Sequence, residues 1–230
     1  MKSGMKETVI LAPHCKQREL LRTLARFGKE LFGVRVMDAG ELSKSLLLRS
    51  GVSYGKLISL KEETYLYDSF LRDIPYFRLS SFQDSRHIAV SFHQLRSLIL
   101  QDEEKTIIEK LKEGVFLEKN EALTEVYERY NSLKKEAGVL DEIDLIRLAV
   151  EKAEKREDIS FKCIKEYPLT PLEEVLLKKV SGDLEEISLS DLYPKGEERE
   201  FSYHQAYDIS DEIREVLEDI YQKNIPLMSV

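Results

Sequence analysis

Residues 7–28 read ETVILAPHCKQRELLRTLARFG and predict a β-strand, a turn and an α-helix. The strand is the β-branched and aliphatic run 8–11, which Ala12-Pro13 ends. One side of the helix carries Leu20, Leu21, Leu24 and Phe27. Many nucleotide-binding α/β domains open in this order, with a glycine-rich turn whose backbone N–H groups and lysine surround phosphate. The turn here, residues 13–17, reads PHCKQ and has neither a glycine nor a Lys-Ser/Thr pair, so we expect no phosphate site in it.

The composition indicates a chain with a hydrophobic core and an acidic surface. Of its 230 residues, 42% are hydrophobic and 34% are charged, and the formal net charge is −8. That charge argues against a general electrostatic attraction to nucleic acid or to an anionic membrane, because such binding depends on cation–phosphate contacts. A local basic groove is still compatible with it.

Cysteine usage and apolar runs indicate the compartment. Cys15 and Cys163 lie far apart and form neither a disulfide framework nor a CxxC metal motif, which is typical of a reducing cytosol. The N-terminus does not resemble a signal peptide, and the apolar runs are far shorter than the roughly 20 residues that cross a bilayer. We therefore predict a cytoplasmic protein without a membrane partner. The last residues, 227–230, read LMSV like the start of a strand, so we expect the chain to be cut from a longer protein.

Two α/β segments flank a helical segment. Residues 1–60 contain predicted strands at 8–11 and 33–37 with helices after them, which favours a parallel βαβ unit. Across residues 61–156 strand signals nearly vanish, and apolar residues recur every three or four positions. Residues 157–200 return to α/β, with strands predicted at 159–164 and 187–189. We predict an α/β fold with a large all-helical insertion; residues 201–230 either begin a second core domain or add a C-terminal helix to the first.

Local patterns assign structural roles to several polar residues. Residues 170–173 read TPLE, which predicts an N-cap, a proline in the first turn and a capping box. Residues 141–144 read DEID and could hold a metal ion, but capping and starting a helix is the commoner use of such acidic residues. Tyr127 and Tyr130 follow helical spacing and are predicted to lie in the core.

Three segments carry a resemblance to a known family. Residues 34–48 read VRVMDAGELSKSLLL, residues 127–149 read YERYNSLKKEAGVLDEIDLIRLA, and residues 165–177 read KEYPLTPLEEVLL. They resemble, in order, the second core strand and helix, the tyrosine helix with its D-x-x-D-L-I helix, and the Walker B strand end of superfamily I helicases of the UvrD/Rep type. Within that family the chain most resembles the inactivated helicase-like half of the B subunit of AddAB-type (RecC-like) helicase–nucleases. The resemblance implies a RecA-like core, residues 1–60 plus 157–200, with residues 61–156 inserted.

The same resemblance implies that the nucleotide site is lost. His14, Cys15 and Lys16 occupy the place of the phosphate loop. Lys165 stands where active members carry the magnesium-binding Asp, and Glu166 matches their catalytic Glu in place only. Without that Asp and a lysine in a glycine loop, there is no credible Mg–ATP site. We therefore expect no cofactor and no ATP hydrolysis.

The resemblance implies a non-catalytic role in bacterial DNA double-strand-break repair. Such a chain would guide DNA and hold an active helicase–nuclease partner subunit. One alternative is a protein–protein interaction scaffold without DNA contact, which the net charge of −8 favours. A second is a small-molecule enzyme on an α/β fold with a helical lid, which needs a polar cluster at the carboxyl ends of the strands. There the sequence offers only His14, Cys15, Asp38 and Glu166.

Basic residues near aromatic ones are the candidates for DNA contact. Lys44 and Arg49 lie close to the position of the family's single-strand contact. The least acidic part of the insertion combines cations with rings, and this combination can bind the backbone and stack bases. Its candidates are Arg72, Arg78, Arg86 and Arg96, which lie among Tyr76, Phe77, His87 and His93. A solvated surface over a helical core is the simpler interpretation of the same pattern.

The sequence predicts no catalytic and no metal-binding residue. The adjacent His14 and Cys15 lack the spatial pairing and third group that a Cys–His nucleophile needs. His87 and His93 are six positions apart, which does not suit two ligands on one helix face. Residues 103–105, EEK, match the short part of a nuclease motif but lack a flanking strand. Any nuclease domain of the parent protein would lie beyond residue 230.

Overall fold

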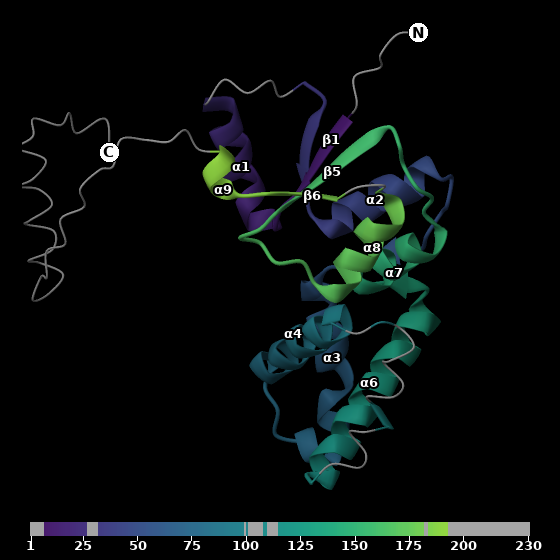
Figure 1. Ribbon diagram of the computed structural model, residues 1–230. Coiled ribbons are helices and arrows are strands. Elements are labelled where there is room, and N and C mark those ends of the chain that lie inside the picture. Colours follow the sequence, from purple (N-terminus) through teal and green to yellow (C-terminus); the bar gives the residue numbers. More distant parts are fainter. Residues whose placement is uncertain are drawn as a thin grey trace, which may run out of the picture. The chain divides into compact units, whose positions relative to one another are not determined.

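A four-stranded parallel sheet is built from strands of both α/β segments (Figure 1). The computed structural model describes residues 7–26, 32–98, 100, 108–109, 115–181 and 184–192. Strand β1 (Glu7–Leu11) pairs with β2 (Val34–Met37) on one side and β5 (Ile159–Ile164) on the other, and β6 (Leu184–Ile187) pairs with β5. The sheet confirms the predicted α/β fold. The last strand lies at 184–187, earlier than the predicted 187–189.

Helices cover both faces of this sheet (Figure 1). On one face, α1 (His14–Arg26) and α9 (Leu189–Leu192) meet a small cluster that includes Ile10, Leu20 and Leu24. Leu21, predicted on the same side of α1, is 37% exposed instead. The larger cluster lies on the other face, where α2 (Ala39–Arg49), α7 (Glu142–Lys152) and α8 (Pro171–Val180) pack. Burial on both faces of the sheet explains the continuous apolar run at the end of β1, whereas β2, β5 and β6 include polar residues.

A second hydrophobic cluster belongs to the inserted helices. It joins α3 (Leu60–Phe70), α4 (Phe82–Leu98) and α6 (Leu117–Ala137), with the short 3-10 helices η1 (Leu71–Asp73) and η2 (Pro75–Phe77) between α3 and α4. Tyr127 and Tyr130 are buried in it, as predicted. Their rings and those of Tyr67 and Phe92 account for much of its packing.

The chain enters and leaves the insertion at one place. Strands β3 (Lys56–Leu57) and β4 (Val139–Leu140) pair in parallel there. A Cβ at Gly55 would lie 2.6 Å from the carbonyl oxygen of Gly138, so only glycine allows this approach. Helix α7 follows β4 and packs on α2 and α8, although the sequence groups it with the insertion. The inserted helices that are distinct from the sheet core therefore end with α6.

The helix starts agree with their local sequence signals. Thr170 caps α8 in the predicted capping box, and Asp141 caps α7 as predicted, in a capping box with Asp144 that the sequence analysis does not predict. Among the described helices, none is long and apolar enough to cross a membrane. Several predictions lie outside the described residues: the positions of Phe27 and of residues 103–105, most of the predicted helix around 107–111, and all elements from 201 to 230.

Candidate functional site at the carboxyl edge of the sheet

The carboxyl edge of the sheet contains a switch point. After β1 the chain passes through α1 to β2, whereas after β5 it passes through α8 to β6, on the other side of β1 in the strand order. In open parallel sheets, ligands bind outside the strand ends at such a point. A cavity of about 110 Å³ lies there, lined in part by Leu11, Asp38 and residues 167–169.

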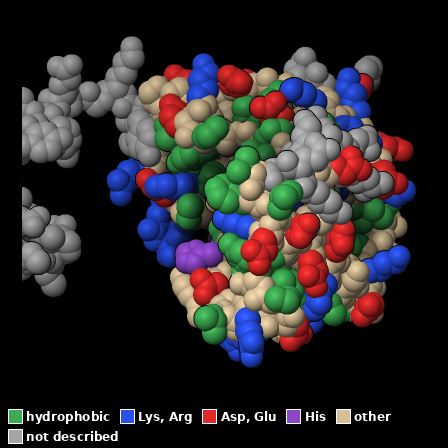
Figure 2. Space-filling model, turned by 90° about the horizontal axis from the view of Figure 1, so that it is seen from below, with side chains coloured by type: hydrophobic (Ala, Val, Ile, Leu, Met, Phe, Trp, Pro, Cys, Tyr) green, Lys and Arg blue, Asp and Glu red, His purple; other side chains and the backbone are tan. Residues whose placement is uncertain are grey.

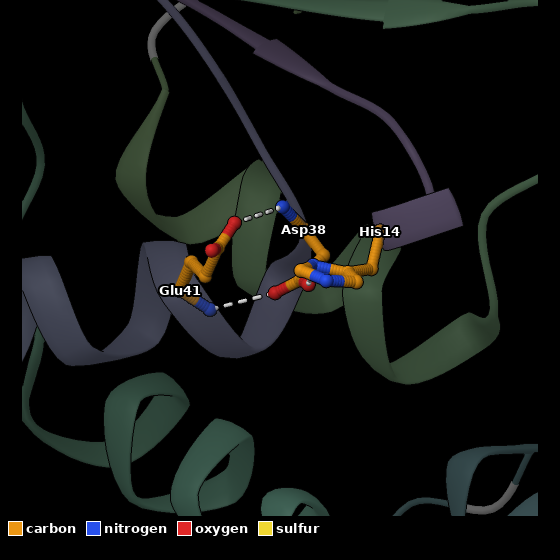
Figure 3. Close-up of side chains that lie close together, drawn as sticks. All are labelled: His14, Asp38 and Glu41. Carbon is orange, nitrogen blue, oxygen red and sulfur yellow. Dashed lines mark hydrogen bonds and ion pairs between the residues drawn. The ribbon is translucent and has the colours of Figure 1, made fainter. Parts of the chain in front are cut away.

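His14, Asp38 and Glu41 converge at this edge (Figure 3). His14 begins α1 after β1, and Asp38 is the N-cap of α2 after β2, so the parallel pairing of these strands brings the two residues together. His14 Nδ1 lies 3.7 Å from Asp38 Oδ2. The backbone N–H of Glu41 donates to Asp38 Oδ1 at 2.8 Å, and that of Asp38 donates to Glu41 Oε2 at 3.1 Å. This capping box fixes both carboxylates.

Gln17 and Glu142 complete the surroundings of this group. Gln17 Nε2 donates to Glu41 Oε2 at 2.8 Å and lies 3.5 Å from Asp38 Oδ2. Glu142 comes from α7, and a Cβ at Gly40 would lie 2.5 Å from its Oε1, so glycine makes room for this carboxylate. Burial raises the pKa of Glu142 above its ordinary value, and the charge of Asp38 raises it further.

The crevice beside this group is acidic. It has a volume of about 410 Å³ and opens beside α2, the start of α3 and the start of α7. The described residues in its lining include the four carboxylates of Asp38, Glu41, Glu62 and Glu142, together with Lys44 and His14. An excess of carboxylates favours cations over phosphate groups in such a space.

The turn after β1 does not form a phosphate cradle. The N–H of Lys16 donates to the carbonyl of Pro13 at 2.8 Å, so α1 begins directly after the strand. The ammonium of Lys16 pairs with Glu19 at 3.0 Å along the same helix. Cys15 is a free, exposed thiol. Of the three residues at the phosphate-loop position, His14 is the one in the lining of the crevice.

Lys165 and Glu166 lie at the end of β5 and are exposed. Glu166 Oε1 accepts from the Ser188 hydroxyl at 2.6 Å, and its Oε2 accepts from the N–H of Leu189 at 3.0 Å. These hydrogen bonds lower the pKa of Glu166 from its ordinary value. Glu166 thus tethers the start of α9 to the end of β5.

Arg96 is buried, which contradicts its prediction as a DNA contact. It is 2% exposed, and its guanidinium donates to the carboxylates of Asp141 and Asp144. Lys134 donates to the same two carboxylates. The Tyr130 hydroxyl lies 2.9 Å from Asp141 Oδ2 and 3.0 Å from Glu63 Oε2. Two cations and two carboxylates thus balance one another in the interior, where an unpaired charge is costly.

This buried ion cluster, defined by Arg96, Lys134, Asp141 and Asp144, joins the inserted helices α4 and α6 to the start of α7. Burial opposes the ionisation of Asp141, but the charges of Arg96 and Lys134 outweigh it and hold the pKa of Asp141 well below its usual range. Nearby, the Glu63 carboxylate, 3.6 Å from His93 Nδ1, raises the pKa of His93 above its ordinary value, although burial opposes this. The cluster is therefore structural in character.

The remaining DNA candidates fall into two groups. Arg49 pairs at 2.8 Å with Glu7, the first residue of β1, and Lys44 lies in the acidic crevice. Arg72, Arg78 and Arg86 are exposed on the insertion. Figure 2, which views the molecule from the end where Figure 1 draws the inserted helices, shows Lys and Arg, His and hydrophobic side chains next to one another at one margin. Acidic side chains gather closer to the middle of that face.

Residues at two places were missed by the sequence analysis: the group of His14, Asp38 and Glu41, and the buried ion cluster. Glu41 was readable as the fourth residue of a D-x-x-E capping box after a strand. Gln17, Lys134 and Glu63 carry no such signal, because their roles depend on which helices pack together. No protein-family model and no curated protein sequence matches the chain.

Proposed function

We propose that this chain is a helicase-like part, without ATP hydrolysis, of a bacterial DNA double-strand-break repair helicase–nuclease subunit, and that it acts in the cytoplasm. Its role would be to guide DNA and to hold an active partner subunit. The resemblance of residues 34–48, 127–149 and 165–177 supports the family. The parallel α/β core and its inserted helices are compatible with it.

The absence of ATP hydrolysis is supported by the charge of the strand edge. Phosphate groups of a nucleotide would meet Asp38, Glu41 and Glu142, and Lys16 is turned away into its pair with Glu19. We expect isothermal titration with Mg–ATP to give no saturable heat and no phosphate release. Saturable binding accompanied by measurable turnover would contradict the proposal.

The DNA role rests on one surface of the insertion, which we call the arginine–aromatic surface. It is defined by Arg72, Arg78, Arg86, Tyr65, Tyr76 and Phe82, all exposed. The rings of Tyr65 and Phe82 lie 5.3 Å apart, so residues from α3 and α4 meet on it. Arg72 Nε donates to the carbonyl of Ser80 at 3.0 Å, which places Arg72 against the loop before α4. Among the described residues, no hydrogen bond or ion pair engages the guanidinium of Arg78 or of Arg86, so both groups can contact phosphate.

Single-stranded DNA suits this surface better than duplex DNA, because exposed rings can stack on unpaired bases while arginines contact the backbone. Acidic residues nearby limit the affinity: Asp73 and Asp84 are exposed on the same segment. The net charge of −8 has the same effect. Binding should therefore be weak and evident mainly at low salt.

We expect the triple replacement of Arg72, Arg78 and Arg86 by alanine to abolish most single-strand binding. Arg72 is paired with Asp68, so loss of the two phosphate contacts of Arg78 and Arg86 should reduce the slope of log K against log salt by about 1.4. Fluorescence anisotropy with a labelled oligonucleotide at two salt concentrations measures both quantities. The matched control is Lys44→Ala with Arg49→Ala, which we expect to retain binding.

The same assay decides between alternatives. Binding that is lost in the Lys44/Arg49 variant and kept in the triple variant would move the DNA contact to the position that the family resemblance implies. An absence of binding even at low salt would favour the interaction scaffold without DNA contact.

A further inference from the structure

We propose that His14, Asp38 and Glu41 form a binding site for a divalent transition-metal ion. Each residue offers one ligand atom, and these atoms all lie within 4.8 Å of one another. Two ligands of one ion, each about 2.1 Å from it, are at most about 4.2 Å apart. A bound ion therefore requires a small approach of these atoms, and the side chain of His14, 82% accessible, has room to move.

The two carboxylates are already in position. Their capping box uses Asp38 Oδ1 and Glu41 Oε2, and among the described residues no hydrogen bond engages Glu41 Oε1. Asp38 Oδ2 faces the imidazole. A metal ion would therefore bind carboxylate oxygens whose side chains the helix start has ordered in advance, which lowers the entropy cost of binding.

Groups around the ligands support the same conclusion. Gln17 Nε2 donates to Glu41 Oε2 at 2.8 Å, the kind of outer hydrogen bond that orients a ligating carboxylate. The adjacent crevice of about 410 Å³ gives solvent and ions access. Glu142, held against Gly40, adds a further carboxylate to that crevice and thus more negative charge near a bound cation. Lys44 also lines the crevice, and its positive charge offsets only part of the negative charge of the four carboxylates.

The ligand set favours one class of metal. An imidazole nitrogen with two carboxylate oxygens suits Zn²⁺ and other divalent first-row ions, whereas Mg²⁺ prefers oxygen ligands and retains water. The site would thus bind Zn²⁺ more tightly than Mg²⁺. This inference does not depend on the proposed DNA role, because its test contains neither DNA nor nucleotide.

Titration of the whole chain with Zn²⁺ by calorimetry tests the proposal. We expect one site of micromolar or tighter affinity in the unmodified protein, and His14→Ala to weaken it by about tenfold or more. Asp38→Asn with Glu41→Gln should weaken it similarly, while both amides still serve the capping box, so the fold is kept. Circular dichroism and the unfolding midpoint verify that these variants fold.

Two matched controls locate the ion. His87→Ala removes another exposed histidine, on α4, and Cys15→Ser removes the thiol next to His14. Both should bind Zn²⁺ within twofold of the unmodified protein. The proposal is overturned if no Zn²⁺ binds below millimolar concentration, if His14→Ala leaves the affinity unchanged, if Cys15→Ser abolishes binding, or if Mg²⁺ binds as tightly as Zn²⁺.

Discussion

Asp141→Asn is expected to lower the free energy of unfolding by about 3–5 kcal/mol, because it leaves two buried cations facing a single carboxylate. Asp141 is fully buried, and both Arg96 and Lys134 donate to it. Asparagine is as good an N-cap as aspartate, so the start of α7 should be preserved. The decrease in the free energy of unfolding therefore measures the contribution of the buried ion cluster and not that of the cap. Urea unfolding monitored by circular dichroism measures it.

The chain offers a close control. Asp38 is also an N-cap with a capping box, at the start of α2, but it is only partly buried, and within the described part of the chain no buried cation donates to it. Asp38→Asn, measured without added metal, should change the unfolding free energy by about 0.5 kcal/mol or less. Equal losses in the two variants would show that the cap, and not the ion cluster, carries the stability.

Acid should reduce the difference in the free energy of unfolding between the unmodified protein and Asp141→Asn. The folded pKa of Asp141 lies below the unfolded value of about 3.9, so its contribution is complete above that pH and is lost as the pH falls through the folded pKa. Unfolding midpoints at pH 7 and below pH 4 measure this. A difference that stays constant into acid would contradict the role of the Asp141 charge.

Local signals explain what could be predicted of the fold. Thr170 is predictable as a cap because its capping box lies within four residues, and Asp141 because acidic residues favour the start of a helix. The alternating apolar residues Ile159, Phe161 and Cys163 predict strand β5, but they do not say which strand it pairs with. The strand order could not be read, because the pattern of a strand does not identify its neighbours.

The buried ion cluster and the pair of His14 and Asp38 show why site residues are harder to predict than helices and strands. Arg96 and Asp141 are 45 positions apart, and only the packing of α4 against α7 brings them together. In the sequence, Arg96 looks like Arg86, although one is buried and the other exposed. His14 and Asp38 were both noted at strand ends, but their approach depends on β1 and β2 being neighbours.

Tyr67→Ala is expected to lower the free energy of unfolding by about 3–5 kcal/mol, since it empties the aromatic part of the insertion's core. Tyr67 is 1% exposed, and its ring stacks on Tyr130 with centroids 4.3 Å apart. Tyr65 lies two positions away on the opposite side of α3 and is 55% exposed, so Tyr65→Ala should cost about 1 kcal/mol or less.

Tyr67→Ala should destabilise the sheet as well as the inserted helices. Unfolding of α4 and α6 would remove Arg96 and Lys134 from Asp141 and expose the sides of α7 and α8 that α4 covers. Because α7 and α8 belong to the sheet's core cluster, we expect the two clusters to unfold together. Hydrogen exchange of the unmodified protein and Tyr67→Ala then gives the same decrease in opening free energy for β5 and α6 amides. Protection lost in α6 but unchanged in β5 would show instead that the insertion unfolds alone and that the buried ion cluster does not couple it to the sheet.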